Sequence, residues 1–445
     1  MERKIRLSQC MIVKNEEKNI QRALSWGKDI FWEQIVVDTG STDNTVAMVK
    51  ELGAALFSFS WIDDFAAAKN YAMAQAQGDW IAFLDADEYF SPEDTDKLLP
   101  ILEEAEAAGY HAVMASWVQV DGSEDILSDK TGQGLNWQMT VKADGSRGMS
   151  LTGTQIRLFR NQPDLCYRGR VHEKLYLERG QLRIVDKSQE LSILHTGYTP
   201  EELKEKNKAE RNILLVKKEL EDHPEDYKLM TYLGDAYFQE KKLEEAAGWY
   251  QKATRRLPEN LREDSLMGAL IFKHLLVIYT DLDQEKKLLS SYREGIRHFP
   301  KEADFDFLMG RFYAEKERWP EAAQYLQKAL GQLERYGSDG ISVLLARSLI
   351  EAWELLVVCH YENGNLEACV SSAVTLLKAD PWRIDTLKTM LRAFKADEQR
   401  RKNAASPVQV LTFLQNFYDF RAEQTMAFVR EAARAGEYEG LVKLL

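Results

Sequence analysis

Cysteine, long apolar runs and excess positive charge are all scarce in this sequence. Its four cysteines lie far apart and form no CxxC pair: Cys10, Cys166, Cys359 and Cys369. This spacing argues against a disulfide framework or a cysteine-based zinc site, and it favours reduced thiols in a cytoplasmic protein. No apolar run approaches the roughly 20 residues that span a bilayer, and no apolar core of a signal peptide follows the first residues. We therefore expect a cytoplasmic protein without a transmembrane segment.

The charge balance argues against another large class of proteins. The chain has 58 Lys and Arg residues against 71 Asp and Glu residues, which gives a formal net charge of −13. Nucleic-acid-binding proteins usually present a basic face, so no nucleic-acid partner is expected, although a nucleotide held by a metal is not excluded. At 445 residues, with 45% hydrophobic and 29% charged residues, the chain is expected to form a soluble globular protein of two or three domains.

Up to about residue 200, short apolar segments alternate with amphipathic ones. The elements expected from this pattern are, in order, strand 7–13, helix 17–26, strand 34–38, helix 42–52, strand 54–59, helix 66–76 and strand 80–84. Alternation of strands and helices predicts an α/β domain with a mostly parallel, doubly wound sheet.

Acidic and polar residues follow three of these strands. Asp85 and Asp87 come directly after the apolar run Ile81–Leu84, and the segments Lys14–Glu16 and Asp38–Asp43 follow two other strands. Ligands of open α/β sheets bind at the carboxyl ends of the strands. Two carboxylates at alternate positions suit a divalent metal that also binds phosphate oxygens. We therefore expect the three loops to meet at one ligand site.

Beyond residue 200 the strands disappear and a repeat of small and large residues begins. Residues at the spacings of tetratricopeptide repeats are Leu233, Gly234, Tyr237, Ala246, Tyr250, Ala253 and Pro258, and again Gly310, Tyr313, Ala322, Leu326 and Ala329. Such repeats stack helix pairs into a curved surface that commonly binds peptide or protein; an unrelated helical bundle is the alternative. We place a tetratricopeptide-repeat domain at 201–383. A C-terminal cap or self-association region at 384–445 would allow a homo-oligomer.

The N-terminal half resembles the family 2 glycosyltransferases with the A-type fold. The resemblance rests on Cys10–Glu17, Val36–Asp43 and Phe83–Glu88, which match three signature segments of that family, and also on Trp61–Asn70 and Ala76–Trp80. Since it covers about residues 5–200, we place the glycosyltransferase domain at 1–200. Together with the repeats, the arrangement is similar to bacterial enzymes that glycosylate peptides, such as the sublancin-type S-glycosyltransferases.

The resemblance implies a nucleotide-sugar donor, expected to be a UDP-sugar, and a divalent metal, Mn²⁺ or Mg²⁺. A metal acts as a Lewis acid on the departing diphosphate, and Asp87 is the acid expected to bind it. Asp85 is expected to face the ribose and metal-bound water, and Asp38 the base. The other expected donor contacts are Val13, Asn15 and Glu16 beneath the base, and Lys69 at a phosphate.

Several of these residues have structural alternatives. Asp85 and Asp87 could favour the start of a helix at Ser91. Asp38 could be part of a turn and helix cap, although Asp43 suits that role better. Lys69 could be an ordinary solvated lysine.

The segment after residue 150 carries the candidates that the sequence leaves open. His172 and His195 are alternative further metal ligands, as the resemblance implies. Glu173 is the first candidate for the general base, which must lie within hydrogen-bond reach of the acceptor, and Glu88 is the second. A cysteine acceptor would depend less on a general base than a hydroxyl acceptor, because its thiol has a lower pKa. The segment 121–150 is expected to be an acceptor loop or a plain surface excursion.

The sequence therefore predicts an inverting glycosyltransferase. It would move a sugar from a UDP-sugar to a Cys, Ser or Thr side chain of a peptide or protein that the repeats present. A glycan or lipid-linked acceptor is the alternative. A catalytically decayed peptide-binding scaffold is the competing class, against which the intact acids Asp38, Asp85 and Asp87 argue.

Overall fold

The computed structural model of the protein describes residues 4–119, 136–141, 147–196, 208–259, 261–262, 265–337, 342–401 and 404–445. Contacts within the chain divide it into two compact units, Met1–Arg256 and Leu257–Leu445. The domain limits expected at residues 200 and 383 remain predictions. The first compact unit extends beyond residue 200, and its described residues include three helices that follow the sheet.

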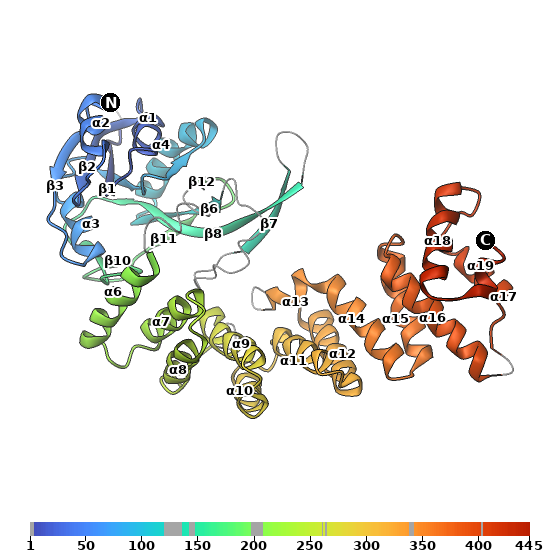
Figure 1. The fold of residues 1–445 in the computed structure, drawn as a ribbon. Coiled ribbons are helices and arrows are strands. Elements are labelled where there is room, and N and C mark those ends of the chain that lie inside the picture. The colour runs from blue at the N-terminus through green and yellow to red at the C-terminus, as the bar shows by residue number, and fades with distance from the viewer. Residues whose placement is uncertain are drawn as a thin grey trace. The chain divides into compact units, whose positions relative to one another are not determined.

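The α/β fold class of the N-terminal part is confirmed by a ten-stranded sheet with the order β3-β2-β1-β4-β8-β6-β12-β5, to which β11 and β7 add at β6 and β8 (Figure 1). The first four strands of that order are parallel, whereas β8 runs antiparallel to β4 and β6, so the sheet is mixed. The strands are β1 (Leu7–Val13), β2 (Phe31–Asp38), β3 (Ala55–Ser58), β4 (Trp80–Phe83), β5 (Glu88–Phe90), β6 (Ala112–Gln119), β7 (Asn136–Val141), β8 (Arg147–Arg160), β11 (Ile184–Asp186) and β12 (Ser192–His195). A separate hairpin consists of β9 (Leu165–Arg168) and β10 (Lys174–Leu177).

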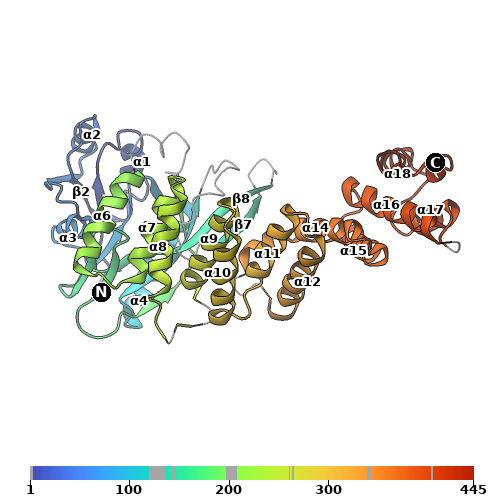
Figure 2. The same ribbon diagram turned by 60° about the horizontal axis from the view of Figure 1, so that its bottom comes forward.

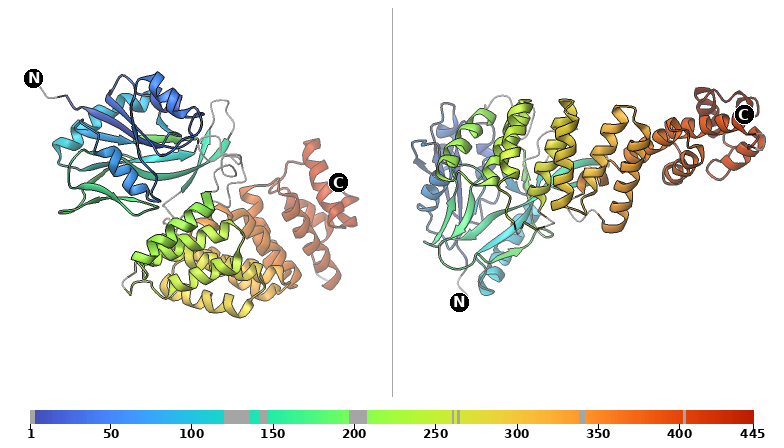
Figure 3. Two further views of the ribbon diagram at one scale, coloured as in Figure 1. Left: turned by 60° about the vertical axis from the view of Figure 1, so that its left-hand side comes forward. Right: turned by 90° about the horizontal axis from the view of Figure 1, so that it is seen from below.

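Helices cover both faces of this sheet (Figure 3). They are α1 (Ile20–Ser25), α2 (Thr45–Leu52), α3 (Phe65–Met73) and α4 (Pro92–Ala107). Strand β4 shows why both faces are covered: Trp80 and Ala82 pack in the cluster that contains the α4 side chains, while Ile81 and Phe83 pack in the cluster that contains the α3 side chains. Side chains alternate between the two faces of a strand, so an entirely apolar strand requires a helix on each side. The expected strand 80–84 fits this arrangement.

Two expectations for this domain differ from the structure. The second helix begins at Thr45 and not at Thr42, because the Asp43 carboxylate accepts hydrogen bonds from the Thr45 backbone N–H (3.0 Å) and hydroxyl (2.5 Å) and holds the preceding residues in a loop. The expected loop at 121–150 contains β7 and the start of β8, which pair antiparallel. For those residues the loop expectation was wrong, and the others of that segment lie outside the described residues.

Helices follow the sheet to the end of the described chain. The first compact unit contains α6 (Lys208–Asp222), α7 (Tyr227–Gln239) and α8 (Leu243–Thr254), which lie side by side (Figures 1 and 2). The second contains α9 (Leu266–Asp281), α10 (Glu285–His298), α11 (Ala303–Glu315), α12 (Trp319–Tyr336), α13 (Val343–Arg347), α14 (Leu349–Glu362), α15 (Leu366–Ala379), α16 (Ile384–Arg400), α17 (Pro407–Leu414), α18 (Glu423–Ala435) and α19 (Glu439–Val442). Among the described residues, no helix is both long and apolar enough to cross a membrane.

Glycines at the repeat positions allow the two helices of a pair to approach closely. A Cβ atom added to Gly234 of α7 would lie 2.5 Å from Cε1 of Tyr250 in α8. A Cβ atom on Gly310 of α11 would lie 2.7 Å from Cγ of Leu326 in α12. The small and large residues expected from the repeat pattern therefore face each other within each helix pair.

Candidate active site

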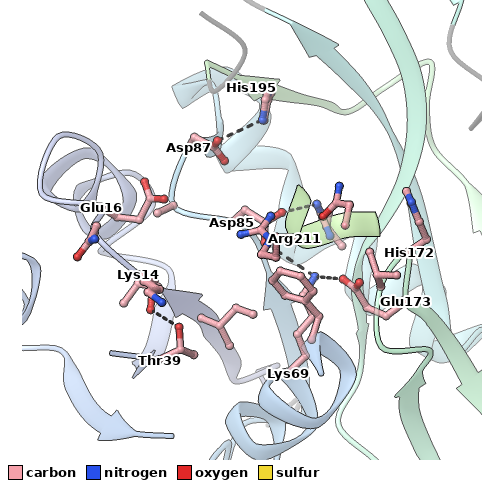
Figure 4. Close-up of a pocket in the computed structure, with 18 of the residues that line it drawn as sticks. Lys14, Glu16, Thr39, Lys69, Asp85, Asp87, His172, Glu173, His195 and Arg211 are labelled. Carbon is pink, nitrogen blue, oxygen red and sulfur yellow. Dashed lines mark hydrogen bonds and ion pairs between the residues drawn. The ribbon is translucent and has the colours of Figure 1, made fainter. Parts of the chain in front are cut away.

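A cavity of about 620 Å³ lies at the carboxyl ends of β1, β2 and β4 (Figure 4). Most of the site residues expected from the sequence line it: Val13, Asn15, Glu16, Lys69, Asp85, Asp87, His172, Glu173 and His195. Two others, Asp38 and Glu88, are not part of the lining. Polar residues from strand ends, from α3, from the β9–β10 loop and from α6 thus converge on one hollow.

One end of the cavity is formed by the loops after β1 and β2, which hold each other in place. The Thr39 backbone N–H donates to the Val13 carbonyl oxygen (2.9 Å), and the Thr42 N–H donates to Oδ1 of Asn15 (2.7 Å). Asn15 has a positive φ of 56°, which asparagine tolerates better than most residues. These contacts give the loop after β1 a fixed shape at the expected nucleobase end.

Asp38 has the turn role that was the alternative in the sequence. Its carboxylate is 9% exposed and accepts hydrogen bonds from the backbone N–H groups of Gly40 (3.1 Å) and Ser41 (3.1 and 3.2 Å). Asp38 is not among the residues that line the cavity, and its expected contact with the base remains a prediction. Its position favours a role in shaping the loop.

Asp87 and His195 face each other at a second end of the cavity (Figure 4). Their Oδ2 and Nε2 atoms are 3.3 Å apart. Strand β12 pairs antiparallel with β5 so that His195 lies opposite Glu88, and the Thr196 N–H donates to the Asp87 carbonyl oxygen (3.0 Å). This strand register brings the late histidine beside the acidic strand end.

The tautomer of His195 is set by its other ring nitrogen. Nδ1 lies 2.7 Å from Oε1 of Gln119; an amide oxygen only accepts, so Nδ1 donates the proton. In the neutral ring the Nε2 lone pair then points to Asp87, a contact that repels unless a proton or a cation lies between the two groups. One imidazole nitrogen and one carboxylate fit a divalent cation. The described residues contain no group of three or more His, Cys, Asp or Glu side chains placed to hold a metal.

His172 belongs to a different part of the cavity. It lies in the loop between β9 and β10 with a positive φ of 53°, and its ring stacks on Tyr232 of α7 with 3.9 Å between the centroids. Burial lowers the pKa of His172, which the neighbouring Glu173 only partly opposes. Figure 4 shows His172 beside Glu173 and away from the pair formed by Asp87 and His195. The geometry therefore brings only His195 to Asp87.

Lys69 and Glu173 form a buried ion pair. Lys69 Nζ lies 2.6 Å from Oε1 of Glu173 and 3.8 Å from Oδ1 of Asp85. Lys69 is 3% exposed, and its Nζ atom lies 5.2 Å from the ring centres of both Phe83 and Tyr167, so it is not an ordinary solvated lysine. Burial lowers the pKa of Lys69, but the Glu173 and Asp85 carboxylates raise it more, and the ammonium stays protonated.

Arg157 of β8 is a site residue that the sequence analysis did not identify. It lies at a β-bulge, where Val113 pairs with Leu158 and Met114 with Ile156 so that Arg157 has no partner on β6; bulges of this kind redirect a side chain. Arg157 Nη2 donates to Oδ2 of Asp85 (2.9 Å) and to Oε1 of Glu88 (2.7 Å). It thus links the acid on the cavity wall to an acid beneath it.

Glu88 is buried under the cavity and does not reach into it. It is 2% exposed and accepts hydrogen bonds from Trp117 Nε1 (3.0 Å), from Arg157 and from the Asp85 backbone N–H (3.1 Å). These donors make Glu88 a support for Asp85 and Arg157. Glu88 is not among the residues that line the cavity, so the geometry favours Glu173 over Glu88 as the candidate general base.

Two cavity residues come from α6, in the helical part of the chain. Arg211 and Asn212 line the cavity together with Phe65 of α3, and Figure 4 shows Arg211 extending into it. The Arg211 guanidinium carbon lies 5.1 Å from the centre of the Phe65 ring. No motif in the sequence indicated these two residues.

Comparisons with known proteins agree with this architecture. Residues 8–160 match the family described as glycosyl transferase family 2, and residues 214–260 and 289–338 match the tetratricopeptide repeat. A TPR repeat-containing protein of Synechococcus elongatus is 33% identical over 256 residues, which cover 56% of this chain and 57% of that protein. The SPbeta prophage-derived glycosyltransferase SunS of Bacillus subtilis is 26% identical over 306 residues, or 67% of this chain and 64% of SunS.

The chain thus spans less than two thirds of the length of both relatives. Among solved structures, S. aureus TarS 1–349 in complex with UDP-GlcNAc is similar, with 17% identity and a TM-score of 0.34 over 67% of this chain and 90% of that chain.

Proposed function

We propose that this chain, which carries a family 2 glycosyltransferase domain and tetratricopeptide repeats, transfers a sugar from a UDP-sugar to a side chain of a peptide or protein. The observation that carries the proposal is the pairing of Asp87 with His195 at the edge of a cavity that also contains Lys69 and Glu173. The glycosyltransferase SunS is a relative that is 26% identical to this chain over 306 residues, which supports the proposal.

Asp87 and His195 would hold a divalent metal, Mn²⁺ or Mg²⁺. Such a metal supplies positive charge to the diphosphate as it departs from the sugar. Because these two side chains fill only part of the coordination of such a metal, phosphate oxygens and water would supply the remaining ligands. Asp85 would face the ribose side, where Arg157 and Lys69 fix the direction of its carboxylate. Loop 13–16 would receive the base.

Glu173 is the residue that we propose as the general base. Lys69 holds one of its carboxylate oxygens at 2.6 Å, and the second can accept the proton of the acceptor hydroxyl or thiol. The acceptor oxygen or sulfur then forms the bond to the anomeric carbon, while the bond from that carbon to the diphosphate breaks with its electron pair on the leaving group. Direct displacement of this kind inverts the anomeric centre.

The repeats support an acceptor that is a peptide or protein, because stacked helix pairs offer an extended surface for a chain segment. A glycan or lipid-linked acceptor is the second candidate. To distinguish the two acceptor classes, the purified chain is incubated with Mn²⁺, a panel of UDP-sugars and either peptides or oligosaccharides, and the glycosylated products are identified by mass. Mass shifts confined to the oligosaccharides would refute the peptide proposal.

Asp87→Ala tests the metal assignment and the competing decayed scaffold. We expect the variant to lose sugar transfer and Mn²⁺-stimulated UDP binding while its circular dichroism spectrum stays that of the unsubstituted chain. Asp96→Ala, which removes an exposed acid on α4, is the matched control and should remain active. Full turnover by Asp87→Ala would exclude the assignment, and absence of UDP binding by the unsubstituted chain would favour the scaffold.

A further inference from the structure

Helix α6 belongs to the helical part of the sequence but forms a wall of the catalytic cavity. Arg211 and Asn212, in its first two turns, line the cavity beside Phe65. The guanidinium carbon lies 5.1 Å from the centre of the Phe65 ring, and Arg211 is among the side chains that line the cavity (Figure 4). Arg211 is an exposed side chain, so its charge is accessible to a ligand.

Ion pairs fix α6 against the catalytic domain. Lys218 of α6 pairs with Asp63, just before α3. Arg170, in the β9–β10 loop, pairs through Nη1 with Glu219 (3.3 Å) and Asp222 (2.5 Å), and its backbone N–H donates to Glu219 (3.1 Å). Two separate segments of the catalytic domain, before α3 and between β9 and β10, thus contact the same helix.

The adjacent helix contributes a further contact to the same loop. The ring of His172 stacks on that of Tyr232, in α7. Because the loop that bears Arg170 and His172 also bears Glu173, the docked helices and the proposed base share one support. The position of Arg211 relative to the cavity is therefore set by the protein itself before any ligand binds.

Some of the positively charged side chains around the cavity form ion pairs with protein carboxylates that the structure describes, and Arg211 does not. Lys69 is paired with Glu173 and Asp85, and Arg157 with Asp85 and Glu88. Arg211 has no ion pair with a carboxylate in the part of the chain that the structure describes; its recorded partner is the Phe65 ring. A fixed guanidinium without a protein counter-charge, in a cavity expected to hold a diphosphate, indicates a site for an anion.

We propose that Arg211 binds the diphosphate of the donor nucleotide, so that the helical region completes the donor site as well as presenting the acceptor. This inference rests on the proposed function. Guanidinium groups recognise phosphate oxygens through two parallel hydrogen bonds. The phosphate next to the sugar gains negative charge as the bond to the anomeric carbon breaks, and a cation already in position stabilises that charge without rearrangement.

The test measures UDP and uridine binding by calorimetry with Mn²⁺ present, using the full chain. Arg211→Gln should raise the dissociation constant of UDP about 10- to 100-fold, the size of a lost hydrogen bond to a charged group, and should leave that of uridine unchanged. Arg211→Lys should lie between, because lysine keeps the charge but not the two-pronged geometry. Lys217→Gln removes a charge from the same helix away from the cavity, beside Tyr237, and should bind as the unsubstituted chain does.

Three results would overturn the inference. UDP binding could be unchanged in Arg211→Gln while only the acceptor KM rises, which would assign Arg211 to the acceptor. Arg211→Gln could weaken the binding of UDP and of uridine equally, which would make Arg211 a structural residue. Lys217→Gln could weaken UDP binding as much as Arg211→Gln does, and the loss of one positive charge on the helix would then explain the effect. If the unsubstituted chain binds no UDP at all, the proposed function itself fails, and with it this inference.

Discussion

Replacement of Arg157 by leucine is expected to destabilise the N-terminal α/β domain strongly. Arg157 is the cation between Asp85 and Glu88, and the Glu88 side chain beneath it is 2% exposed. Without the guanidinium, Glu88 stays buried as a carboxylate, and the described part of the chain supplies it with the Trp117 indole and the Asp85 backbone N–H as donors. Breaking a buried ion pair by removing one partner costs about 3–5 kcal/mol. Because two donors remain, we expect about 3 kcal/mol.

A second substitution separates the cost of the unpaired charge from that of lost packing. In the double variant Arg157→Leu with Glu88→Gln, no unpaired charge is left in the interior, and the amide oxygen can still accept from Trp117. The free energy of unfolding should then fall by about 1–2 kcal/mol, the cost of one or two hydrogen bonds. The double variant should therefore be more stable than the single variant Arg157→Leu.

Hydrogen exchange followed by mass spectrometry suits this chain, because exchange is read segment by segment and does not require the two compact units to unfold together. The amides of β4 and β8 report on the N-terminal α/β domain. Since 1.4 kcal/mol corresponds to a tenfold change, their protection should fall about 100-fold in Arg157→Leu and about 10-fold in the double variant. Helix α15 lies in the other compact unit and serves as the internal reference.

The reasoning fails if Arg157→Leu changes the protection of β4 and β8 less than tenfold. It also fails if the double variant is as unprotected as the single one, since the buried Glu88 charge would then not be the cause. Equal loss of protection in α15 would mean that the substitution acts on the whole chain.

Three further predictions concern other parts of the molecule. Glu173→Gln should lower kcat by about 10²- to 10⁴-fold, as expected for a lost general base, with UDP binding unchanged by calorimetry; near-normal kcat would exclude it as the base. Burial lowers the pKa of His172, so its contribution to stability is complete above its unfolded pKa of about 6.5 and is lost as the pH falls through its folded pKa. His172→Phe keeps a ring against Tyr232 and should therefore lose less melting temperature between pH 7.5 and 5.5 than the unsubstituted chain; equal losses would contradict the assignment. Gly234→Ala forces a methyl group into the Tyr250 ring and should cost about 1–3 kcal/mol, whereas Gly248→Ala, with nothing within 4 Å, should stabilise its helix. Equal melting temperatures of these two variants would contradict the close helix packing.

The fold was predictable where one strong pattern decides the local structure. The run Ile81–Leu84 is apolar at every position, and the structure buries it between helices on both faces of the sheet. The spacing of Gly234 and Tyr250 likewise predicted a pair of closely packed helices. Element ends were less predictable, because Asp43 forms a local hydrogen-bonded turn that competes with the first turn of the helix after it.

The acids were the part of the candidate site that the sequence predicted most directly. Asp85 and Asp87 follow directly from the end of a buried strand. The choice between His172 and His195 depends on the pairing of β12 with β5, which joins segments that the sequence does not relate. The sequence around Arg157 shows the polar alternation of a strand. Neither the β-bulge at Arg157 nor its acidic partners could be predicted from that segment alone.

Arg211 was less predictable still. A charged residue near the start of an amphipathic helix is ordinarily solvated, and only the tertiary position of α6 brings it to the cavity.

The pairing of Asp87 with His195 also has a consequence for biosynthesis. The hydrogen bond from Thr196 to the Asp87 carbonyl oxygen joins residues 109 positions apart. Synthesis adds about 5–20 residues per second, so a growing chain carries Asp87 for roughly 5–20 s before His195 exists. During that interval β5 lacks the neighbour that β12 will provide. A ribosome-stalled chain that ends before residue 195 would contain β1, β2 and β4 with their loops, yet it would lack the imidazole half of the pair.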